Sequence, residues 1–162
     1  MATVYLGLGS NESPEENLRL AIRELKSRFG NLTLSRVYQS APVGFEGCDF
    51  LNLVARLESE VSPIDICAEI ESIHNLAGRV RNSDKWGSRP LDIDLLLYND
   101  LVQDERPVRV PRDDIVLYSF VLRPLAEIAP DQVHPVTGKT FLEHWQAFDV
   151  MSHPLKEKDV VW

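Results

Sequence analysis

Residues 91–98 alternate between two classes of side chain, and this pattern constrains the fold more than any other stretch of the sequence. The odd positions are all aliphatic: Leu91, Ile93, Leu95 and Leu97. The even positions carry two carboxylates followed by two apolar groups: Asp92, Asp94, Leu96 and Tyr98. Successive side chains of a β-strand point to opposite faces of its sheet. The stretch therefore predicts a strand with one apolar face and an aspartate pair on the other.

The two aspartates are candidate metal ligands. Residues i and i+2 of a strand lie about 6.5–7 Å apart, so Asp92 and Asp94 can converge on one divalent cation or hold two. A solvated strand face is the alternative for such a pair. Asp is disfavoured in strands, however, and the apolar Leu96 and Tyr98 on the same face indicate partial burial, where carboxylates need a cation or an arginine partner. We therefore interpret Asp92 and Asp94 as ligands of Mg²⁺.

The segment just before this strand is basic, although the chain as a whole has a formal net charge of −8. Its cationic residues are Arg79, Arg81, Lys85 and Arg89. A solvated loop would also explain them. Next to a carboxylate pair, the local positive charge favours a site that holds a divalent cation and a polyphosphate together.

Composition restricts the class of protein. A chain of 162 residues with 44% hydrophobic and 26% charged residues is typical of one globular domain. Its acidic balance argues against a nucleic-acid or anionic-membrane surface, and no segment is long and apolar enough to span a membrane. Two cysteines, Cys48 and Cys67, are too few for a disulfide framework and favour a reducing compartment. We expect a cytoplasmic protein.

The order of expected elements defines the fold class. We expect strands over 3–8, 32–38, 50–58 and 91–98, and helices over 14–29 and 63–76, with Ser13 and Ser62 as N-caps. Shorter elements follow: an edge strand over 108–110, a helix over 121–128 interrupted by Pro124, and a closing helix over 141–148. This order predicts a ferredoxin-like α+β fold, a single domain over 1–162 with a mostly antiparallel sheet and helices packed on one face. We expect residues 149–162 to form a loosely ordered tail.

Five stretches of the sequence resemble one enzyme family. Residues 86–97 read W-G-x-R-x-L-D-I-D-L-L-L, and L-G-S-N occupies 8–11, S-A-P-V-G 40–44, F-L-N 50–52 and G-R-V-R 78–81. Together they resemble the 6-hydroxymethyl-7,8-dihydropterin pyrophosphokinases of folate biosynthesis, over about residues 3–145. The resemblance implies that the pterin hydroxymethyl oxygen attacks the β-phosphorus of ATP and that AMP leaves.

The resemblance also implies roles on the nucleotide side. Asp92 and Asp94 would bind two Mg²⁺ ions, and Arg79 and Arg89 would contact the phosphates as catalytic residues. The remaining implied ATP contacts are Glu71, Arg81, Trp86 and Arg112. Arg81 and Trp86 would belong to a loop that closes over both substrates. We interpret His74, on the same helix as Glu71, as part of a solvated helix face.

On the pterin side, the resemblance implies a polar group and an aromatic wall. Asn52 would read the amide-like edge of the ring, because a side-chain amide both donates and accepts hydrogen bonds. Phe120 would stack on the ring, with Phe45 and Phe50 as weaker candidates. The other implied pterin contacts are Ser40, Ala41, Pro42, Val43, Gly44 and Trp86.

One segment departs from the family pattern. Arg112 stands where the family usually has His, and Tyr118 stands where it has Arg. Arg112 can replace the lost charge, whereas Asp113 and Asp114 add repulsion toward a polyanion. The leading expectation is a monomeric enzyme with small-molecule partners, ATP and a pterin. The alternative is a divergent relative with altered nucleotide use, which acts as a pterin-binding protein or on a related pterin.

Overall fold

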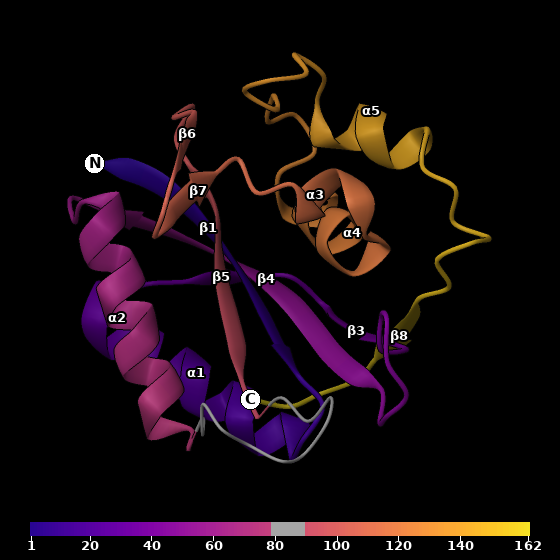
Figure 1. Ribbon diagram of the computed structural model, residues 1–162, viewed down its shortest axis with the longest axis horizontal. Helices are drawn as coiled ribbons and strands as arrows, with labels where there is room; N and C mark the ends of the chain where they lie inside the picture. The colour runs from indigo at the N-terminus through magenta and orange to yellow at the C-terminus, as the bar shows by residue number, and fades with distance from the viewer. Residues whose placement is uncertain (79–89) are drawn as a thin grey trace.

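The fold is organised around a six-stranded sheet in which every pairing is antiparallel (Figure 1). The computed structural model describes residues 1–78 and 90–162. The strand order is β5-β1-β4-β3-β8, and β2 also pairs with β4. The strands are β1 (Ala2–Ser10), β2 (Thr33–Leu34), β3 (Val37–Ser40), β4 (Phe50–Ser59), β5 (Asp92–Tyr98) and β8 (Lys156–Lys158). The order β5-β1-β4-β3, with helices after β1 and β4, confirms the expected ferredoxin-like α+β fold.

The helices lie on both faces of the sheet (Figure 1). On the first face are α1 (Pro14–Phe29) and α2 (Pro63–Leu76). On the second are α3 (Asp114–Leu117), α4 (Ser119–Ile128) and α5 (Phe141–Gln146). The prediction that helices pack on one face is thus correct for α1 and α2 and incomplete for the molecule, because the short C-terminal helices cover part of the other face.

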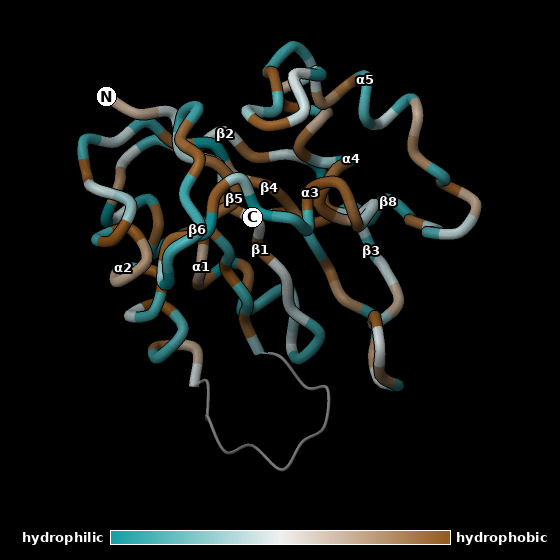
Figure 2. Tube along the Cα trace, turned by 45° about the horizontal axis from the view of Figure 1, so that its top comes forward, coloured by the Kyte–Doolittle hydropathy of each residue, from teal (hydrophilic) through white to brown (hydrophobic). Residues whose placement is uncertain are grey.

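Alternating residues of the central strands form the core under α1 and α2. Four alternating residues of β4 are buried there: Leu51, Leu53, Ala55 and Leu57. The matching set from the helices is Leu18, Ala21, Ile22, Leu25, Ile66, Ile70 and Ile73. Strand period two thus meets helix period 3.6 in one apolar layer, which accounts for the hydrophobic colouring of these segments in Figure 2.

A second core joins α4 and α5 to the other face of the sheet. Its members include Tyr5, Val54, Leu96, Leu122, Leu125 and Phe141. Polar contacts strengthen this packing: the Tyr38 hydroxyl donates to Glu127 Oε1 at 2.6 Å, and Arg123 lies 5.0 Å above the Tyr38 ring. Burial and the Glu127 carboxylate raise the pKa of Tyr38 to about 12, so its phenol stays protonated.

A bulge in β5 interrupts the alternation of faces that the sequence predicts for residues 91–98. Leu6 pairs with Leu95, whereas the next residue back, Tyr5, pairs with Leu97, so Leu96 is the extra residue. The faces exchange at this point: Leu97 packs in the second core and Tyr98 against the first, opposite to the sequence expectation. Asp92 and Asp94 precede the bulge, and their shared face is therefore as predicted.

The predicted strand 32–38 is divided by Ser35. Its Oγ accepts a hydrogen bond from the backbone N–H of Val54, and its own N–H donates to the Val54 carbonyl, both at 2.9 Å. The side chain thus takes a ladder position that a backbone carbonyl would otherwise occupy. The result is two short strands, β2 and β3, in place of one.

The two predicted serine caps differ. Ser62 Oγ accepts a hydrogen bond from the N–H of Asp65 at 3.2 Å, which confirms it as the N-cap of α2. Ser13 has φ 41° and ψ 54° and makes no side-chain cap bond, so its predicted capping role is wrong. In this left-handed conformation the hydroxyl does not cap the first turn of α1.

The C-terminal segment is more ordered than predicted. Residues 156–158 form β8, which pairs with β3, and Ser119 Oγ donates to the His153 carbonyl at 3.0 Å. The predicted strand at 108–110 is confirmed as β7 (Val108–Val110), which pairs with β6 (Gln103–Glu105) in a separate hairpin. No helix within 1–78 and 90–162 combines the length and hydrophobicity needed to cross a membrane.

Candidate active-site cleft

Two glycines of β1 lie beside the aspartate pair. Gly9 pairs with Asp92 on one side and Asn52 on the other, and Gly7 pairs with Asp94. Directly opposite residues of an antiparallel ladder project from the same face. Gly9 thus leaves a gap between Asn52 and Asp92, and a Cβ on it would lie only 3.1 Å from Asn52 Oδ1. The sheet surface is hollow where these polar groups face outward.

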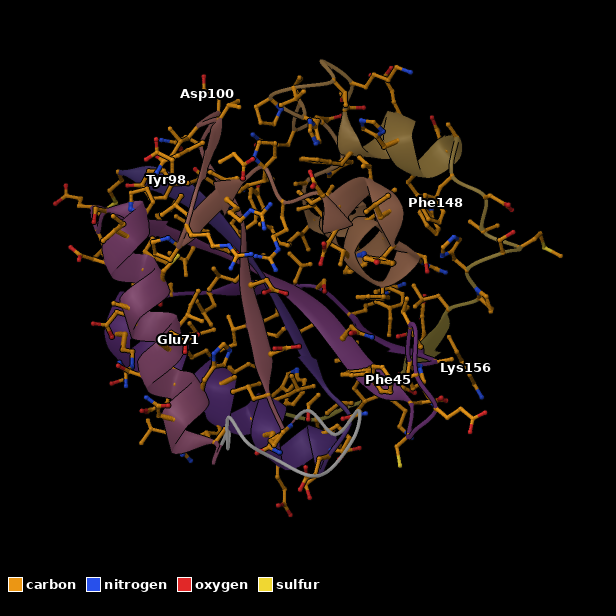
Figure 3. All side chains as sticks on the ribbon, viewed as in Figure 1. Phe45, Glu71, Tyr98, Asp100, Phe148 and Lys156 are labelled. Atoms are coloured by element: carbon orange, nitrogen blue, oxygen red, sulfur yellow. The ribbon has the colours of Figure 1, made fainter. Side chains whose placement is uncertain are left out.

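This hollow is the floor of a cleft of about 820 Å³. The cleft extends from α2, which contributes Glu71 and His74, to the loop after β3, which contributes Phe45. Figure 3 places Glu71 and Phe45 on opposite sides of the central strands. The third wall comes from the segment 107–121 and includes Arg112, Tyr118 and Phe120. A volume of this size suits a small ligand of drug-like dimensions or larger.

Asp92 and Asp94 are half-buried on the cleft floor, and the guanidinium of Arg112 lies close to Asp94. Arg112 Nη2 is 3.3 Å from Asp94 Oδ1, and both side chains remain about one-third exposed, at 35% and 36%. The backbone N–H of Arg112 also donates to the Leu96 carbonyl at 3.0 Å, which fixes the segment against β5. The predicted nucleotide residue Arg112 and the predicted metal residues thus meet at one point.

The donor set around the aspartates fits Mg²⁺. Within 1–78 and 90–162, no three His, Cys, Asp or Glu side chains gather into a closed metal cluster. Mg²⁺ is usually bound by one or two carboxylates and completes its coordination with water and substrate phosphates. Two accessible aspartates on the floor of an open cleft match this requirement, whereas Zn²⁺ sites need three or four protein ligands.

His74 is a buried member of the site, so its interpretation as a solvated helix face is wrong. Its side chain is only 3% exposed, and Nε2 accepts a hydrogen bond from the backbone N–H of Ile93 at 2.9 Å. Nδ1 lies 3.0 Å from Glu71 Oε1. Glu71 itself is half-exposed on the cleft wall. The i, i+3 spacing of Glu71 and His74 indicates that the two side chains are neighbours on the helix. It does not indicate which face of the helix is buried.

Asn52 presents an oriented amide. It is buried, and its Nδ2 donates to Ser40 Oγ at 2.9 Å and to the Tyr38 carbonyl at 3.3 Å. These two acceptors use both amide hydrogens, and they assign the nitrogen and oxygen of the amide. Oδ1 is therefore the atom above Gly9, and Asn52 faces the cleft as a hydrogen-bond acceptor.

Aromatic rings surround the Asn52 end of the cleft. Phe120, the predicted stacking residue, lines it, as do the weaker candidates Phe45 and Phe50. Phe45 and Phe50 contact each other edge to face, with ring centroids 6.1 Å apart. Phe120 stacks on Tyr118, with centroids 5.1 Å apart and an interplanar angle of 14°. A flat ring that enters here meets apolar surfaces on several sides.

The remaining predicted residues divide into three groups. Ser40, Ala41 and Val43 line the cleft, whereas Pro42 and Gly44 are absent from its described lining. Arg79, Arg81, Trp86 and Arg89 lie outside the described residues. Lining residues that were not predicted as site residues include Gly7, Gly9 and Cys67. Burial raises the pKa of the Cys67 thiol, which disfavours its reactive thiolate form.

Comparison with solved structures identifies the fold. The chain superposes on Plasmodium falciparum HPPK-DHPS solved with pterin and p-hydroxybenzoate, with a TM-score of 0.72 and 15% sequence identity. The match covers 90% of this chain and 42% of that polypeptide, so the chain spans less than half of the fused protein. At this identity the likeness concerns the fold alone.

Sequence comparison gives nearer relatives. The chain is 42% identical over 141 residues to the 2-amino-4-hydroxy-6-hydroxymethyldihydropteridine pyrophosphokinase of Haemophilus influenzae, over 83% of this chain and 86% of the relative. It is 37% identical over 145 residues to the enzyme of the same name from Aquifex aeolicus, over 88% and 90%. The model of one family, 7,8-dihydro-6-hydroxymethylpterin-pyrophosphokinase (HPPK), matches residues 5–130. The chain therefore belongs to the HPPK family.

Proposed function

We propose that the cleft floored by Gly7 and Gly9 is where this protein binds ATP and 6-hydroxymethyl-7,8-dihydropterin and transfers the pyrophosphoryl group of ATP to the pterin. As a member of its family the protein is an ATP-dependent pyrophosphokinase, a transferase of folate biosynthesis. The observation that carries the location is the convergence of Asp92, Asp94 and Arg112 at one end of the cleft and Asn52 with its aromatic rings at the other.

The reaction needs two substrates held in line. The hydroxymethyl oxygen of the pterin forms a bond to the β-phosphorus of ATP and loses its proton. The bond from that phosphorus to the oxygen shared with the α-phosphorus breaks, and AMP leaves with the electron pair. Catalysis of such a step consists mainly of positioning and charge neutralisation. The cleft has an acidic end bordered by an arginine, which suits Mg²⁺ and the phosphates of ATP, and an aromatic end, which suits the pterin ring.

At the phosphate end, Asp92 and Asp94 hold two Mg²⁺ ions in our proposal. Bound Mg²⁺ neutralises the oxygens of the transferring phosphates and orients them. Arg112 then exchanges its contact with Asp94 for an ATP phosphate, since its guanidinium already lies at the cleft floor. Glu71 lines the wall of the same half. We keep Arg79, Arg81, Trp86 and Arg89 as proposed ATP contacts, with Arg79 and Arg89 as catalytic groups, on the sequence resemblance alone.

At the aromatic end, Asn52 Oδ1 accepts an N–H from the amide-like edge of the pterin. This direction is supported by the use of both Nδ2 hydrogens inside the protein. Phe120 stacks on the ring, and Phe45 and Phe50 border it. Residues 40–44 are proposed to add backbone contacts to the ring edge, and Trp86 to close over it.

We also propose that the protein acts as a cytoplasmic monomer. The two cysteines of the protein, Cys48 and Cys67, are free thiols, as expected in a reducing compartment. Light scattering of the purified protein tests the oligomeric state, and a dimer at micromolar concentration would contradict it.

The test of function is AMP release from Mg-ATP with and without 6-hydroxymethyl-7,8-dihydropterin. We expect pterin-dependent AMP, reduced at least about 100-fold in Asp92→Asn and Asp94→Asn, because metal-ion charge stabilisation is worth several kcal/mol. The matched control is Asp100→Asn, an exposed carboxylate beyond the far end of β5 (Figure 3), which should retain full turnover. Full turnover in the Asp92 and Asp94 variants would remove the metal assignment. A wild-type protein that releases no pterin-dependent AMP would contradict the activity itself.

A further inference from the structure

The backbone between the two aspartates has an unusual partner. β5 is the outermost strand of the described sheet, and β1 pairs with its inner side. The N–H of Ile93 donates instead to His74 on α2, at 2.9 Å. This N–H therefore points outward, away from β1. Ile93 lies between Asp92 and Asp94, so the bond to His74 holds the peptide from which both carboxylates project.

The hydrogen bonds of His74 also select its tautomer. Nε2 accepts from Ile93, so it carries no proton, and the ring proton is on Nδ1. Nδ1 lies 3.0 Å from Glu71 Oε1, at a donor-to-acceptor distance for that proton. The ring is 3% exposed and its bond to Ile93 is buried, so water does not readily replace that contact. Glu71, His74 and Ile93 thus form one continuous hydrogen-bonded chain from the cleft wall to the strand.

We propose that His74 is a positioning residue for the metal-binding aspartates, and that it connects their strand to Glu71 on the nucleotide wall. This inference rests on the proposed function for the identity of the metal and nucleotide. We assign His74 no direct role in the transfer step, although it lines the cleft. It fixes the peptide of Ile93 and with it the separation and direction of the Asp92 and Asp94 side chains. Groups that orient metal ligands in this way commonly affect metal affinity as well as stability.

The decisive variants are His74→Phe and His74→Gln. Phe keeps an aromatic ring and removes the acceptor for Ile93 and the donor for Glu71. Gln places an acceptor near the Nε2 position and restores the bond to the strand. Ile66→Ala is the control for stability, because Ile66 is fully buried on the same helix and lies outside the cleft lining.

The readout is Mg²⁺ affinity, measured by calorimetric titration of each variant saturated with α,β-methylene-ATP, together with thermal unfolding and pterin affinity. We expect His74→Phe to weaken Mg²⁺ binding about tenfold or more, with pterin affinity unchanged. His74→Gln restores the bond to Ile93 but not the link to Glu71, so it should recover part of the Mg²⁺ affinity that His74→Phe loses. Ile66→Ala should lower the unfolding temperature and leave Mg²⁺ affinity unchanged. Equal Mg²⁺ affinity in His74→Phe and the wild type, or a loss of affinity that Ile66→Ala reproduces, would overturn the proposal.

A double-mutant cycle tests the connection to Glu71. Glu71→Ala should weaken Mg²⁺ binding in the wild-type background and have a smaller effect when His74 is already Phe, because the chain is then broken. Additive effects would overturn the link between Glu71 and the strand. These titrations need no turnover, so they remain informative if the wild-type protein fails to release AMP, a result that would count against the proposed function and not against His74.

Discussion

At the scale of single residues, the two glycines of β1 shape the cleft because they have no side chains to fill it. Gly7 and Gly9 lie on the middle strand, with Asn52, the proposed pterin contact, on one side and Asp92 and Asp94, the proposed metal ligands, on the other. A larger residue in place of Gly9 would project into the hollow, toward Asn52 Oδ1. The Leu-Gly-Ser-Asn motif noted in the sequence thus has a physical role: Gly9 keeps the space above the sheet open.

Gly9→Ala tests this role. The added Cβ would lie 3.1 Å from Asn52 Oδ1, so the amide must shift by a few tenths of an ångström. We expect pterin affinity to fall about fivefold, which corresponds to about 1 kcal/mol for one misaligned hydrogen bond. Tryptophan fluorescence quenching or calorimetry with the pterin measures the change.

Gly7→Ala is the matched control for that variant. The three atoms nearest to its Cβ would all belong to the Leu96 side chain, the closest at 3.4 Å, which is an ordinary van der Waals contact. We expect its pterin affinity to stay close to that of the wild type. An equal loss of affinity in both variants would mean that the glycines matter through the strand and not through Asn52.

At this scale the sequence determines some features of the site and not others, for a physical reason. The shared face of Asp92 and Asp94 follows from strand geometry alone, because they are two residues apart and precede the bulge. The burial of His74 depends on how α2 is rotated against β5, which helical periodicity does not specify for a residue at the edge of the apolar stripe. The Arg112–Asp94 contact joins residues 18 positions apart and needed the tertiary structure.

At the scale of elements, α1 and α2 begin with similar sequences and different caps. Both have Ser followed by Pro, yet only Ser62 has an extended backbone that lets its hydroxyl reach the N–H of Asp65. Ser13 has a positive φ, and the first backbone bond there runs from the Asn17 N–H to the Ser13 carbonyl. The motif Ser-Pro-x-Asp/Glu predicts a helix start correctly in both places, but it does not determine the conformation of the serine.

Ser62→Ala and Ser13→Ala convert this difference into a measurement. Loss of an N-cap hydroxyl costs about 1 kcal/mol, so Ser62→Ala should lower the free energy of unfolding by that amount in urea titrations. Ser13→Ala removes a hydroxyl that caps nothing and should change the free energy by less than half as much. Equal losses would contradict the assignment of Ser62 as the functional cap.

The bulge in β5 is the element-scale feature that the sequence concealed. Residues 91–98 alternate without interruption, and nothing in the pattern marks Leu96 as an extra residue. Both cores are apolar, so Leu97 and Tyr98 can exchange faces without exposing a large hydrophobic surface. Binary patterning cannot specify register where both faces of the sheet are covered.

At the scale of the whole molecule, the chain after α5 returns along the outside of the second layer to the sheet (Figure 1). Along this path the His153 carbonyl accepts from Ser119, at the start of α4, and β8 pairs with β3. Glu157 lies 3.3 Å from both Arg36 and Arg123. The polar, charged composition of this segment favoured a loose tail, and its order depends on backbone pairing with a strand far away in the sequence.

Deletion of residues 149–162 tests the contribution of this segment. We expect a loss of about 2–3 kcal/mol in the free energy of unfolding, mainly from the backbone hydrogen bonds of β8 and the Ser119 contact. Glu157→Gln is the matched variant: it weakens the exposed ion pairs and keeps the ladder, so it should cost less than about 1 kcal/mol. If Glu157→Gln reproduced the full loss, charge and not backbone pairing would hold the segment.

The same deletion should also lower the affinity of the cleft for the pterin. Ser119 immediately precedes Phe120, the proposed stacking residue, and its hydroxyl is held by the His153 carbonyl. Without that contact the first turn of α4 is freer, so pterin affinity should fall while the affinity for Mg-ATP, which depends on residues of β5, is retained. Ser119→Ala removes the same hydrogen bond without removing β8, and we expect it to reproduce the loss of pterin affinity but not the loss of stability. Unchanged pterin binding in both variants would mean that α4 is held by its core residues Val121, Leu122 and Leu125 alone.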